Sequence, residues 1–517
     1  MKSLSDVTFS NSFTSQFPGE FTNDATPRST PKVLFSTVNP QPVKQPKILL
    51  WSNDLSKRLG LSTPPTHSDA EILSGNQIPE SSTPYAACYG GHQFGNWAGQ
   101  LGDGRAINLG EITDPQNKLW EIQLKGAGRT AYSRGADGRA VLRSSFREFI
   151  ASEAMHHLGV PTTRALSLVD TGESVSRDMF YDGNVRAELG AITSRVAESF
   201  VRFGNFEILA AQQEKALLHK LMSWVVDRHY SHLSGKVDLL PLFFQEVCSR
   251  TAHMIAEWLR VGFVHGVMNT DNMSILGQTI DYGPYGWLES YDPLWTPNTT
   301  DLPGRRYCFA AQAPIAHWNL QRLGESLTVI GLTPSQLEEG LRIFRETFTE
   351  KYFKNMARKL GLKDLNPEEH KDFITELDQL MKSLELDYTL FFRALMKPSS
   401  SFESVFSISY KNLNVKEKES LFAWAKKYSD LLAAQNIQKD HQLENMKAAN
   451  PAIVPRNFQL FEAYKLYEEK EDSSLMEKLF EKIQNPYEEP TEYDLLSQKR
   501  PDWAEDQPGS STLSCSS

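Results

Sequence analysis

The stretch His265-Gly-Val-Met-Asn-Thr-Asp-Asn272, followed shortly by Ile280-Asp-Tyr-Gly283, carries more information about the fold than any other part of this sequence. Asn272 and Asp281 offer amide and carboxylate oxygens, the donors that Mg²⁺ or Mn²⁺ uses when it holds a nucleotide polyphosphate. Asp271 adds a second carboxylate directly before Asn272. The stretch therefore predicts a site for a divalent cation and a phosphorylated ligand.

The spacing of this stretch resembles the catalytic and metal-binding loops of protein kinases, which read HxDxxxxN and DFG. His265 and Asn272 keep that spacing, and Asp281-Tyr-Gly283 stands in for DFG. The base Asp expected two residues after His265 is replaced by Val267. Two explanations stay open: a pseudoenzyme that has lost its base, or an enzyme in which Asp271 has taken over because the nucleotide lies differently.

Two further residues upstream fit a kinase-like arrangement. The alternating segment Trp120–Leu124 predicts a strand that leads into Lys125, and the apolar spacing of residues 139–158 predicts a helix that carries Glu148. In kinases a strand lysine pairs with a helix glutamate and binds phosphates. The same pairing is expected here.

A local excess of positive charge surrounds these residues. Arg139, Arg143 and Arg147 follow at helical spacing and predict one basic stripe, with a solvated helix face as the alternative. Arg195 and Arg202 are seven residues apart, so they would share a face of a helix and could clamp a polyphosphate, although ordinary surface arginines fit equally well.

The segment Tyr89–Arg105 is dense in glycine, which lets backbone N–H groups approach an anion. A set of turns in a small sheet is the alternative. The sequence contains no GxxxxGK[ST] motif, which excludes a P-loop nucleotidase.

The order of these patterns predicts an α+β protein with a kinase-like bilobal fold and a helical C-terminal extension. We expect five segments: an N-terminal arm with connectors (1–84), a glycine-rich N-lobe (85–205), a C-lobe with the catalytic and metal-binding loops (206–333), the helical extension (334–490), and a Pro/Ser-rich tail (491–517).

Composition excludes several other classes. The 517 residues carry a formal charge of −10, which argues against nucleic-acid binding. Four cysteines in a chain of this length exclude a disulfide framework, and the lack of a CxxC pair argues against a structural zinc site. The sequence has neither a signal-peptide pattern nor an apolar run long enough to span a membrane, so a cytoplasmic location is expected.

Long motifs identify a resemblance to the selenoprotein O (SelO, also YdiU) family. They are Tyr89-Gly-Gly-His-Gln-Phe-Gly-Asn-Trp-Ala-Gly-Gln-Leu-Gly-Asp-Gly-Arg105, Met268-Asn-Thr-Asp-Asn-Met-Ser-Ile275 and Asp281-Tyr-Gly-Pro284, and the likeness runs from about Val33 to the C-terminus. The resemblance implies a kinase-like fold that binds ATP in an inverted orientation and transfers AMP to protein hydroxyls. Transfer of UMP from UTP is also attributed to the family.

The resemblance also implies roles for individual residues. Asp271 would be the proton acceptor, Asn272 and Asp281 would bind Mg²⁺ or Mn²⁺, and Lys125 would contact phosphate and pair with Glu148. The remaining nucleotide contacts would come from Gly102, Gly104, Arg105, Asp137, Gly138, Arg195 and Arg202.

The sequence departs from the family near its end. Relatives close with CxxU or a CxxC-like motif, whereas Thr512 replaces the first cysteine here and only Cys515 remains, with Cys308 as its nearest candidate partner. Two unpaired thiols are expected.

Three functions are compatible with the kinase-like motifs: a protein adenylyltransferase or uridylyltransferase, a kinase that transfers the γ-phosphate, and a nucleotide-binding scaffold. Val267 argues against the kinase. The joint presence of Lys125, Glu148, Asn272 and Asp281 argues against the scaffold.

Overall fold

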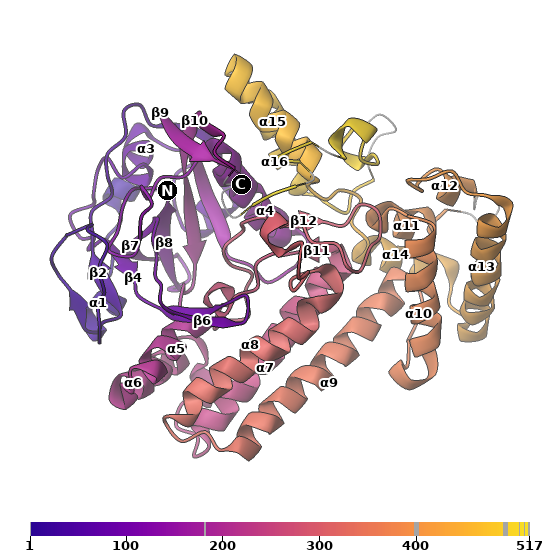
Figure 1. Ribbon diagram of the computed structural model, residues 1–517, viewed down its shortest axis with the longest axis horizontal. Coiled ribbons are helices and arrows are strands. Elements are labelled where there is room, and N and C mark those ends of the chain that lie inside the picture. The colour runs from indigo at the N-terminus through magenta and orange to yellow at the C-terminus, as the bar shows by residue number, and fades with distance from the viewer. Residues whose placement is uncertain are drawn as a thin grey trace.

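The computed structural model describes residues 2–179, 182–397, 403–489, 495–505, 507–510 and 512–514. These residues form a sheet-rich N-terminal lobe, a helical C-terminal lobe and a further group of helices that extends from the second lobe (Figure 1). The predicted α+β class and its helical C-terminal extension are confirmed. Cys515, and with it the prediction about its thiol, lies outside the described residues.

The N-terminal lobe is built on a sheet that has eight strands in the described part of the chain. Neighbouring strands are antiparallel, except that the first two run parallel. In spatial order the strands are β1 (Gly19–Glu20), β2 (Phe35–Thr37), β4 (Tyr85–Ala87), β7 (Ala106–Thr113), β8 (Leu119–Lys125), β10 (Val185–Ala197), β9 (Arg164–Asp178) and β3 (Lys47–Trp51).

The predicted strand before Lys125 is β8, and its alternation explains how polar side chains gather on one face. Ile122 and Leu124 point into the apolar core, so Gln123 and Lys125 lie on the opposite face. The register pairs Arg195 of β10 with Gln123, which places these side chains side by side on that face.

The predicted helix at 139–158 is α4 (Leu142–His157), which packs on β9 and β10. Its other side is covered by α15 (Asn457–Lys470) and α16 (Ser474–Ile483), which return from the C-terminal extension to the sheet lobe (Figure 1). Because the helix is covered on both sides, its polar residues Arg143, Arg147 and Glu148 are buried as well.

The N-terminal segment differs from the loose arm expected from its Ser, Thr and Asn content. Leu4, Phe9, Phe13 and Phe17 are buried, and β1 and β2 extend the edge of the sheet. Aromatic burial, including the stacking of Phe13 on Tyr85, outweighs the polar composition. The helices of this region are α1 (Ser12–Gln16), α2 (Asn53–Arg58) and α3 (His67–Leu73).

The C-terminal lobe consists of long helices around two small strand pairs. The hairpin strands β5 (Gly90–Gln93) and β6 (Asn96–Gln100) lie between the lobes. Strand β11 (Phe263–Val264) pairs with β12 (Gly286–Trp287) beside the kinase-like stretch His265–Asn272, the candidate catalytic loop. The helices are α5 (Phe203–Ala211), α6 (Lys215–His229), α7 (Leu239–Val261), α8 (Gln312–Thr328) and α9 (Pro334–Lys359). None of the described helices combines the length and the apolar character needed to cross a membrane.

The extension has an apolar core of its own, which includes Trp424 and Phe391. Its helices are α10 (Pro367–Ser383), α11 (Tyr388–Ala394), α12 (Glu403–Phe406), α13 (Val415–Gln435) and α14 (Lys439–Ala449). Arg456, at the start of α15, pairs with Asp387, at the start of α11, through contacts of 2.7 and 2.9 Å. This buried pair joins the extension to the helices that cover α4.

Candidate active site

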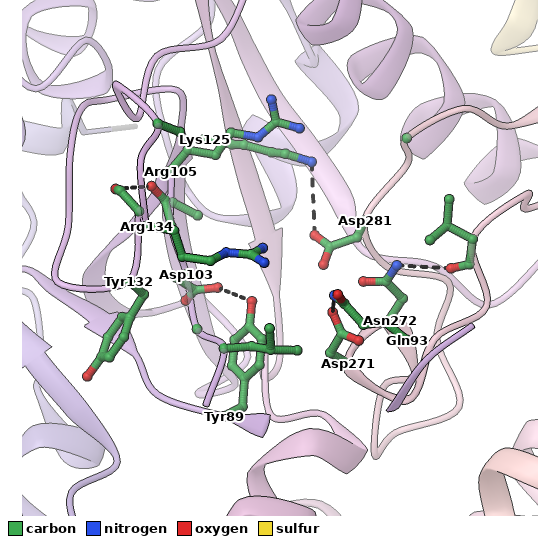
Figure 2. A pocket seen from close by; sticks show the side chains of 18 of the residues that line it. Tyr89, Gln93, Asp103, Arg105, Lys125, Tyr132, Arg134, Asp271, Asn272 and Asp281 are labelled. Atoms are coloured by element: carbon green, nitrogen blue, oxygen red, sulfur yellow. Dashed lines mark hydrogen bonds and ion pairs between the residues drawn. The ribbon is translucent and has the colours of Figure 1, made fainter. Parts of the chain in front are cut away.

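A cavity of ≈ 410 Å³ lies between the polar face of the sheet and the catalytic loop (Figure 2). The sequence-predicted residues that line it are Gly102, Gly104, Arg105, Lys125, Arg195, Asp271, Asn272 and Asp281. Tyr89, Gln93, Asp103, Tyr132 and Arg134 also line the cavity, and sequence reasoning did not assign them a role.

Four predicted residues do not line this cavity. Glu148 and Arg202 lie directly behind it, in contact with residues that do. Asp137 and Gly138 directly follow the cavity residue Ala136 in the chain. Asp137 forms an ion pair of 2.6 Å with Arg177, and Gly138 packs closely against the backbone of Gly128.

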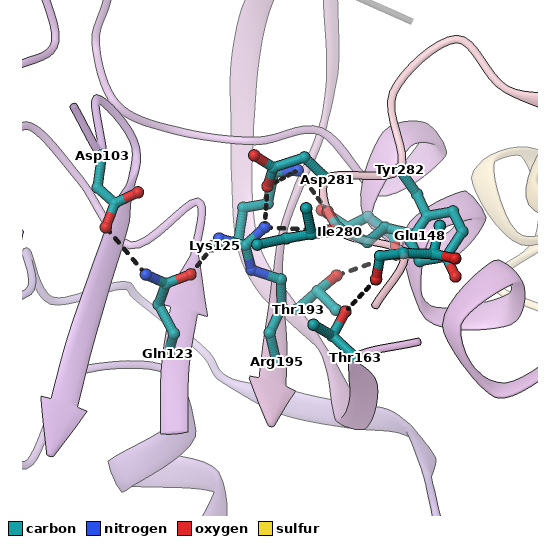
Figure 3. Close-up of polar contacts among 12 residues, drawn as sticks. Asp103, Gln123, Lys125, Glu148, Thr163, Thr193, Arg195, Ile280, Asp281 and Tyr282 are labelled. Carbon is teal, nitrogen blue, oxygen red and sulfur yellow. Dashed lines mark hydrogen bonds and ion pairs between the residues drawn. The ribbon is translucent and has the colours of Figure 1, made fainter. Parts of the chain in front are cut away.

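The predicted pairing of strand lysine and helix glutamate is present. Lys125 Nζ lies 2.7 Å from Glu148 Oε2 and 4.0 Å from Asp281 Oδ1 (Figure 3). Burial lowers the pKa of Lys125, and the Glu148 carboxylate opposes that shift. The lysine is thereby held at the cavity wall between two carboxylates.

Asp281 is the centre of a larger charge cluster. Its carboxylate accepts hydrogen bonds from Arg195 and Arg202 and lies near Lys125. Burial would raise the pKa of Asp281, but these three cations hold it well below its usual range. Asp281 is therefore ionised, and its backbone at φ 60 is left-handed, an uncommon conformation for a residue with a side chain.

Arg195 and Arg202 do not share a helix face as the spacing suggested. Arg195 lies on β10, whereas Arg202 precedes α5, and the two meet because the chain turns between them. Both guanidinium groups are fully buried, and among the described residues the Nε atom of each has no hydrogen-bond partner. Arg195 lines the cavity, and a buried donor without a partner in a polar cavity wall is suited to an anionic ligand.

Asp103 is the residue that sequence reasoning missed most clearly. It accepts hydrogen bonds from the Tyr89 hydroxyl (3.1 Å) and from Gln123 Nε2 (3.0 Å), and Gln123 in turn accepts from Arg195 (Figure 3). Burial raises its pKa. Its position between Gly102 and Gly104 was the available signal, because a lone carboxylate inside a glycine-rich turn has little local reason to be there.

The catalytic loop is fixed from inside the C-terminal lobe. His265 Nε2 lies 2.9 Å from the carbonyl oxygen of Ile280, so the histidine links the loop to the segment that carries Asp281. Asn272 Nδ2 donates to the carbonyl oxygen of Val267 at 2.9 Å, which leaves its amide oxygen for a cation. The Val267 side chain lines the cavity where a kinase has its base.

Asp271 is buried, and no described residue forms a hydrogen bond with its Oδ1 atom. Oδ2 accepts from Gln93 Nε2 at 3.3 Å (Figure 2). Burial raises the pKa of Asp271 to about 6. A carboxylate with one oxygen held, the other unbound and a pKa close to neutrality is well suited to accept a proton.

The hairpin of β5 and β6 holds three successive residues of this loop. The backbone N–H of His92 donates to Thr270 Oγ1 (2.7 Å), Gln93 donates to Asp271, and the backbone N–H of Phe94 donates to the Asn269 side chain (3.1 Å). The glycine-rich segment is thus a hairpin docked on the catalytic loop. The turn alternative was correct for these residues, whereas Gly102 and Gly104 line the cavity.

Two arginines of the predicted basic stripe, Arg143 and Arg147, are buried rather than solvated. Arg143 pairs with Glu188 at 3.0 Å, and Arg147 donates to Asn457 Oδ1 and to the carbonyl oxygen of Tyr285. Their role is to attach α4 to its neighbours.

The donors at the cavity fit a divalent cation. Asp281 and the Asn272 amide oxygen are hard oxygen ligands, and Asp271, whose Oδ1 is buried, directly precedes Asn272 in the chain. No group of three or more His, Cys, Asp or Glu side chains suited to a metal occurs among the residues that the structure describes. Phosphate oxygens and water would have to complete the coordination, as Mg²⁺ prefers.

Comparison with known proteins decides the family. The family model described as "Protein adenylyltransferase SelO" matches residues 21–484. The chain belongs to the SelO family. As a SelO-family chain it is a protein nucleotidyltransferase and uses a nucleotide as co-substrate.

Curated relatives agree with this SelO assignment along the whole chain. Proteins named "Protein nucleotidyltransferase YdiU" are 46% identical in Nitrosospira multiformis (99% of this chain and 97% of the relative), 48% in Azoarcus sp. (99% and 99%) and 47% in Cytophaga hutchinsonii (100% and 100%).

Among solved structures, a Toxoplasma gondii virulence factor described as having a protein-kinase fold and no enzymatic activity matches with a TM-score of 0.23 and 11% identity, over 68% of this chain and 87% of that one. A superposition this weak supports no argument about the SelO-family chain. Its kinase-like character is seen in its own sheet lobe, lysine–glutamate pair and catalytic loop.

Proposed function

We propose that the cavity binds ATP with its α-phosphate toward Asp271, and that the enzyme transfers AMP to a hydroxyl group of a protein. The observation that carries this proposal is that the carboxylate lies at Asp271, whereas the position of the kinase base is occupied by Val267. Val267 offers no proton acceptor, whereas Asp271 has a buried oxygen without a partner. A general base must lie within hydrogen-bond reach of the attacking hydroxyl, so the phosphorus presented near Asp271 is the one attacked.

The cations of the cavity would hold the triphosphate. Lys125 and Arg195 would bind phosphate oxygens, with Glu148 fixing Lys125 and with Arg202 supporting Asp281 from behind. Gly102, Gly104 and Arg105 would line the nucleotide, and Asp137 and Gly138, beyond the rim residue Ala136, would contact its far end.

The transfer step uses few groups. The acceptor oxygen attacks the α-phosphorus, the bond from that phosphorus to the bridging oxygen breaks, and pyrophosphate leaves. The hydroxyl proton moves to the Asp271 carboxylate, which Gln93 keeps in place. Asn272 and Asp281 would hold Mg²⁺ or Mn²⁺, which supplies charge neutralisation at the phosphates. The acceptors proposed are Ser, Thr and Tyr hydroxyls.

Parallel reactions with α-labelled and γ-labelled ATP test the proposal. We expect the α-label on protein and release of pyrophosphate. Protein that carries only γ-label in an Asp281-dependent reaction would make the enzyme a kinase, and nucleotide binding without any transfer would make it a scaffold. α-labelled UTP in a third reaction measures whether UMP is transferred as well.

A further inference from the structure

We propose that the acceptor protein binds through an acidic residue to a cationic and aromatic surface beside the catalytic loop. This acceptor surface consists of Trp97, Leu302, Arg305, Arg306 and Trp318. The inference rests on the proposed function, since it names the chemistry of the polypeptide that presents its hydroxyl to Asp271.

Arg306 is the centre of the acceptor surface. Its guanidinium carbon lies 4.8 Å from the ring centre of Trp318, and its buried Nε has no hydrogen-bond partner in the part of the chain that the structure describes. No carboxylate of the described residues lies within 4.0 Å of its guanidinium. The nearby Asp301 accepts hydrogen bonds from the backbone N–H groups of Arg306 and Tyr307 instead. The guanidinium therefore retains donors for an anion from outside.

The position of Arg306 relative to the base follows from the hairpin. Its guanidinium carbon lies 3.4 Å from the point that a Cβ on Gly95 would occupy. Gln93, two residues earlier, contacts Asp271. Two residues of extended chain span at most about 7 Å. An acceptor that places its hydroxyl at Asp271 would reach Arg306 with a side chain two or three residues away.

The rest of the acceptor surface is exposed and partly apolar. Trp97 is 41% exposed and Leu302 is 44% exposed. The Trp97 ring lies 5.2 Å from the His92 ring, which lies 5.5 Å from Trp318, so the aromatic side chains form one continuous patch. Exposed apolar groups beside a catalytic residue are typical of a polypeptide-binding surface.

The charge of the surface decides the class of partner. Arg305 is exposed, and it forms no ion pair with a described residue. Arg322 also stacks on Trp318, but Glu325 neutralises it at 2.5 Å. In a chain of net charge −10, two neighbouring arginines that have no carboxylate partner among the described residues favour an acceptor segment that carries Glu or Asp.

Two synthetic peptides test this inference. Both contain the same Ser, Thr and Tyr, flanked by Glu in one peptide and by Lys in the other. Label transfer from α-labelled ATP is measured together with peptide binding, by fluorescence anisotropy, in the presence of a non-hydrolysable ATP analogue. We expect the Glu peptide to bind and react about tenfold better, the size of one charge-assisted hydrogen bond.

Variants localise the effect. Arg306→Glu, and separately the exposed Arg305→Glu, should abolish the preference for the Glu peptide while ATP affinity stays unchanged. Arg342→Glu, on the surface of α9, is the matched control and should leave the preference intact.

Equal binding of the two peptides to the unmodified enzyme, or an unchanged preference in both surface variants, would overturn the inference. Absence of α-label on either peptide would instead contradict the proposed function, and the anisotropy measurement would still decide the docking preference.

Discussion

Two buried charge clusters of this molecule differ in how completely their hydrogen bonds are satisfied. In the extension, Asp387 binds Arg456 with two contacts, accepts from the Tyr410 hydroxyl at 2.9 Å and caps α11. Around Asp281, three cations converge on the carboxylate, yet Nε of the cavity residue Arg195 has no hydrogen-bond partner among the described residues. The first cluster is complete by itself, whereas the second has binding capacity left for a ligand.

The difference teaches how to separate stability from function in buried ion pairs. Both clusters bear the desolvation cost of charges removed from water. The Arg456–Asp387 pair recovers that cost within the folded chain, while the Asp281 cluster recovers it fully only when an anionic ligand binds. Replacements in the Arg456–Asp387 pair should therefore lower the free energy of unfolding, whereas replacements in the Asp281 cluster should lower nucleotide affinity.

The largest effect is expected at Asp281. Asp281→Ala should abolish metal-dependent nucleotide binding, because a metal-bridged carboxylate holds the triphosphate in the ground state. Asp271→Ala should keep nucleotide affinity but slow α-transfer by roughly 10²–10⁴-fold, the range of a general base. Titration calorimetry combined with single-turnover labelling distinguishes the two, and equal loss of affinity in both variants would contradict these roles.

The second effect is expected at Asp387 and concerns folding. Asp387→Ala leaves Arg456 buried without its partner and should lower the free energy of unfolding by about 3–5 kcal/mol. Denaturant unfolding measures this loss. The double variant Asp387→Leu/Arg456→Met, which removes both charges, should regain much of it, while nucleotide affinity of the folded protein stays normal. If Asp387→Ala were as stable as the parent chain, the Arg456–Asp387 pair would not be a stabilising element of the fold.

A smaller effect is expected at Gln93, which positions Asp271. Gln93→Ala should lower kcat about tenfold, the size of one hydrogen bond to a charged group, and leave KM for ATP unchanged. Asn96→Ala, in the same hairpin but exposed, serves as the control. A parallel loss in both variants would show that the hairpin as a whole, rather than the Gln93 side chain, is responsible.

The smallest effect is expected at Glu121, which lies opposite Glu111 in the register of β7 and β8. Burial, followed by the Glu111 charge, raises the pKa of Glu121 to about 8. The folded state therefore holds a proton that the unfolded chain releases, and stability falls as pH rises from about 4.5 toward 8. Glu121→Gln should raise Tm by about 2–4 °C more at pH 8 than at pH 5. Identical shifts at the two pH values would contradict the assignment.

Local patterns were sufficient to predict much of this site. Lys125 at a strand end, Glu148 on the next helix and the His265–Asn272 spacing are each set by a few neighbouring residues, and the structure brings the three segments together. Periodicity also identified β8 and α4.

Contacts between distant segments were beyond the reach of such patterns. Arg147 looked like a surface cation because its partner Asn457 is 310 residues away. Arg195 and Arg202 were read with helical spacing, although a strand ends between them. The link from Gln93 to Asp271 depends on a hairpin crossing between the lobes, which no local spacing encodes.

The attachment of α4 has a consequence for control of the enzyme. Many protein kinases switch on and off by swinging the helix that carries the glutamate, which makes or breaks its pair with the strand lysine. Here Arg147 ties that helix to Tyr285 and Asn457, and two helices from the far end of the chain cover it. Rotation would break these contacts and expose the apolar surface beneath the two helices. The pair of Lys125 and Glu148 is therefore fixed by the packing of the far end of the chain, rather than made and broken by a swinging helix.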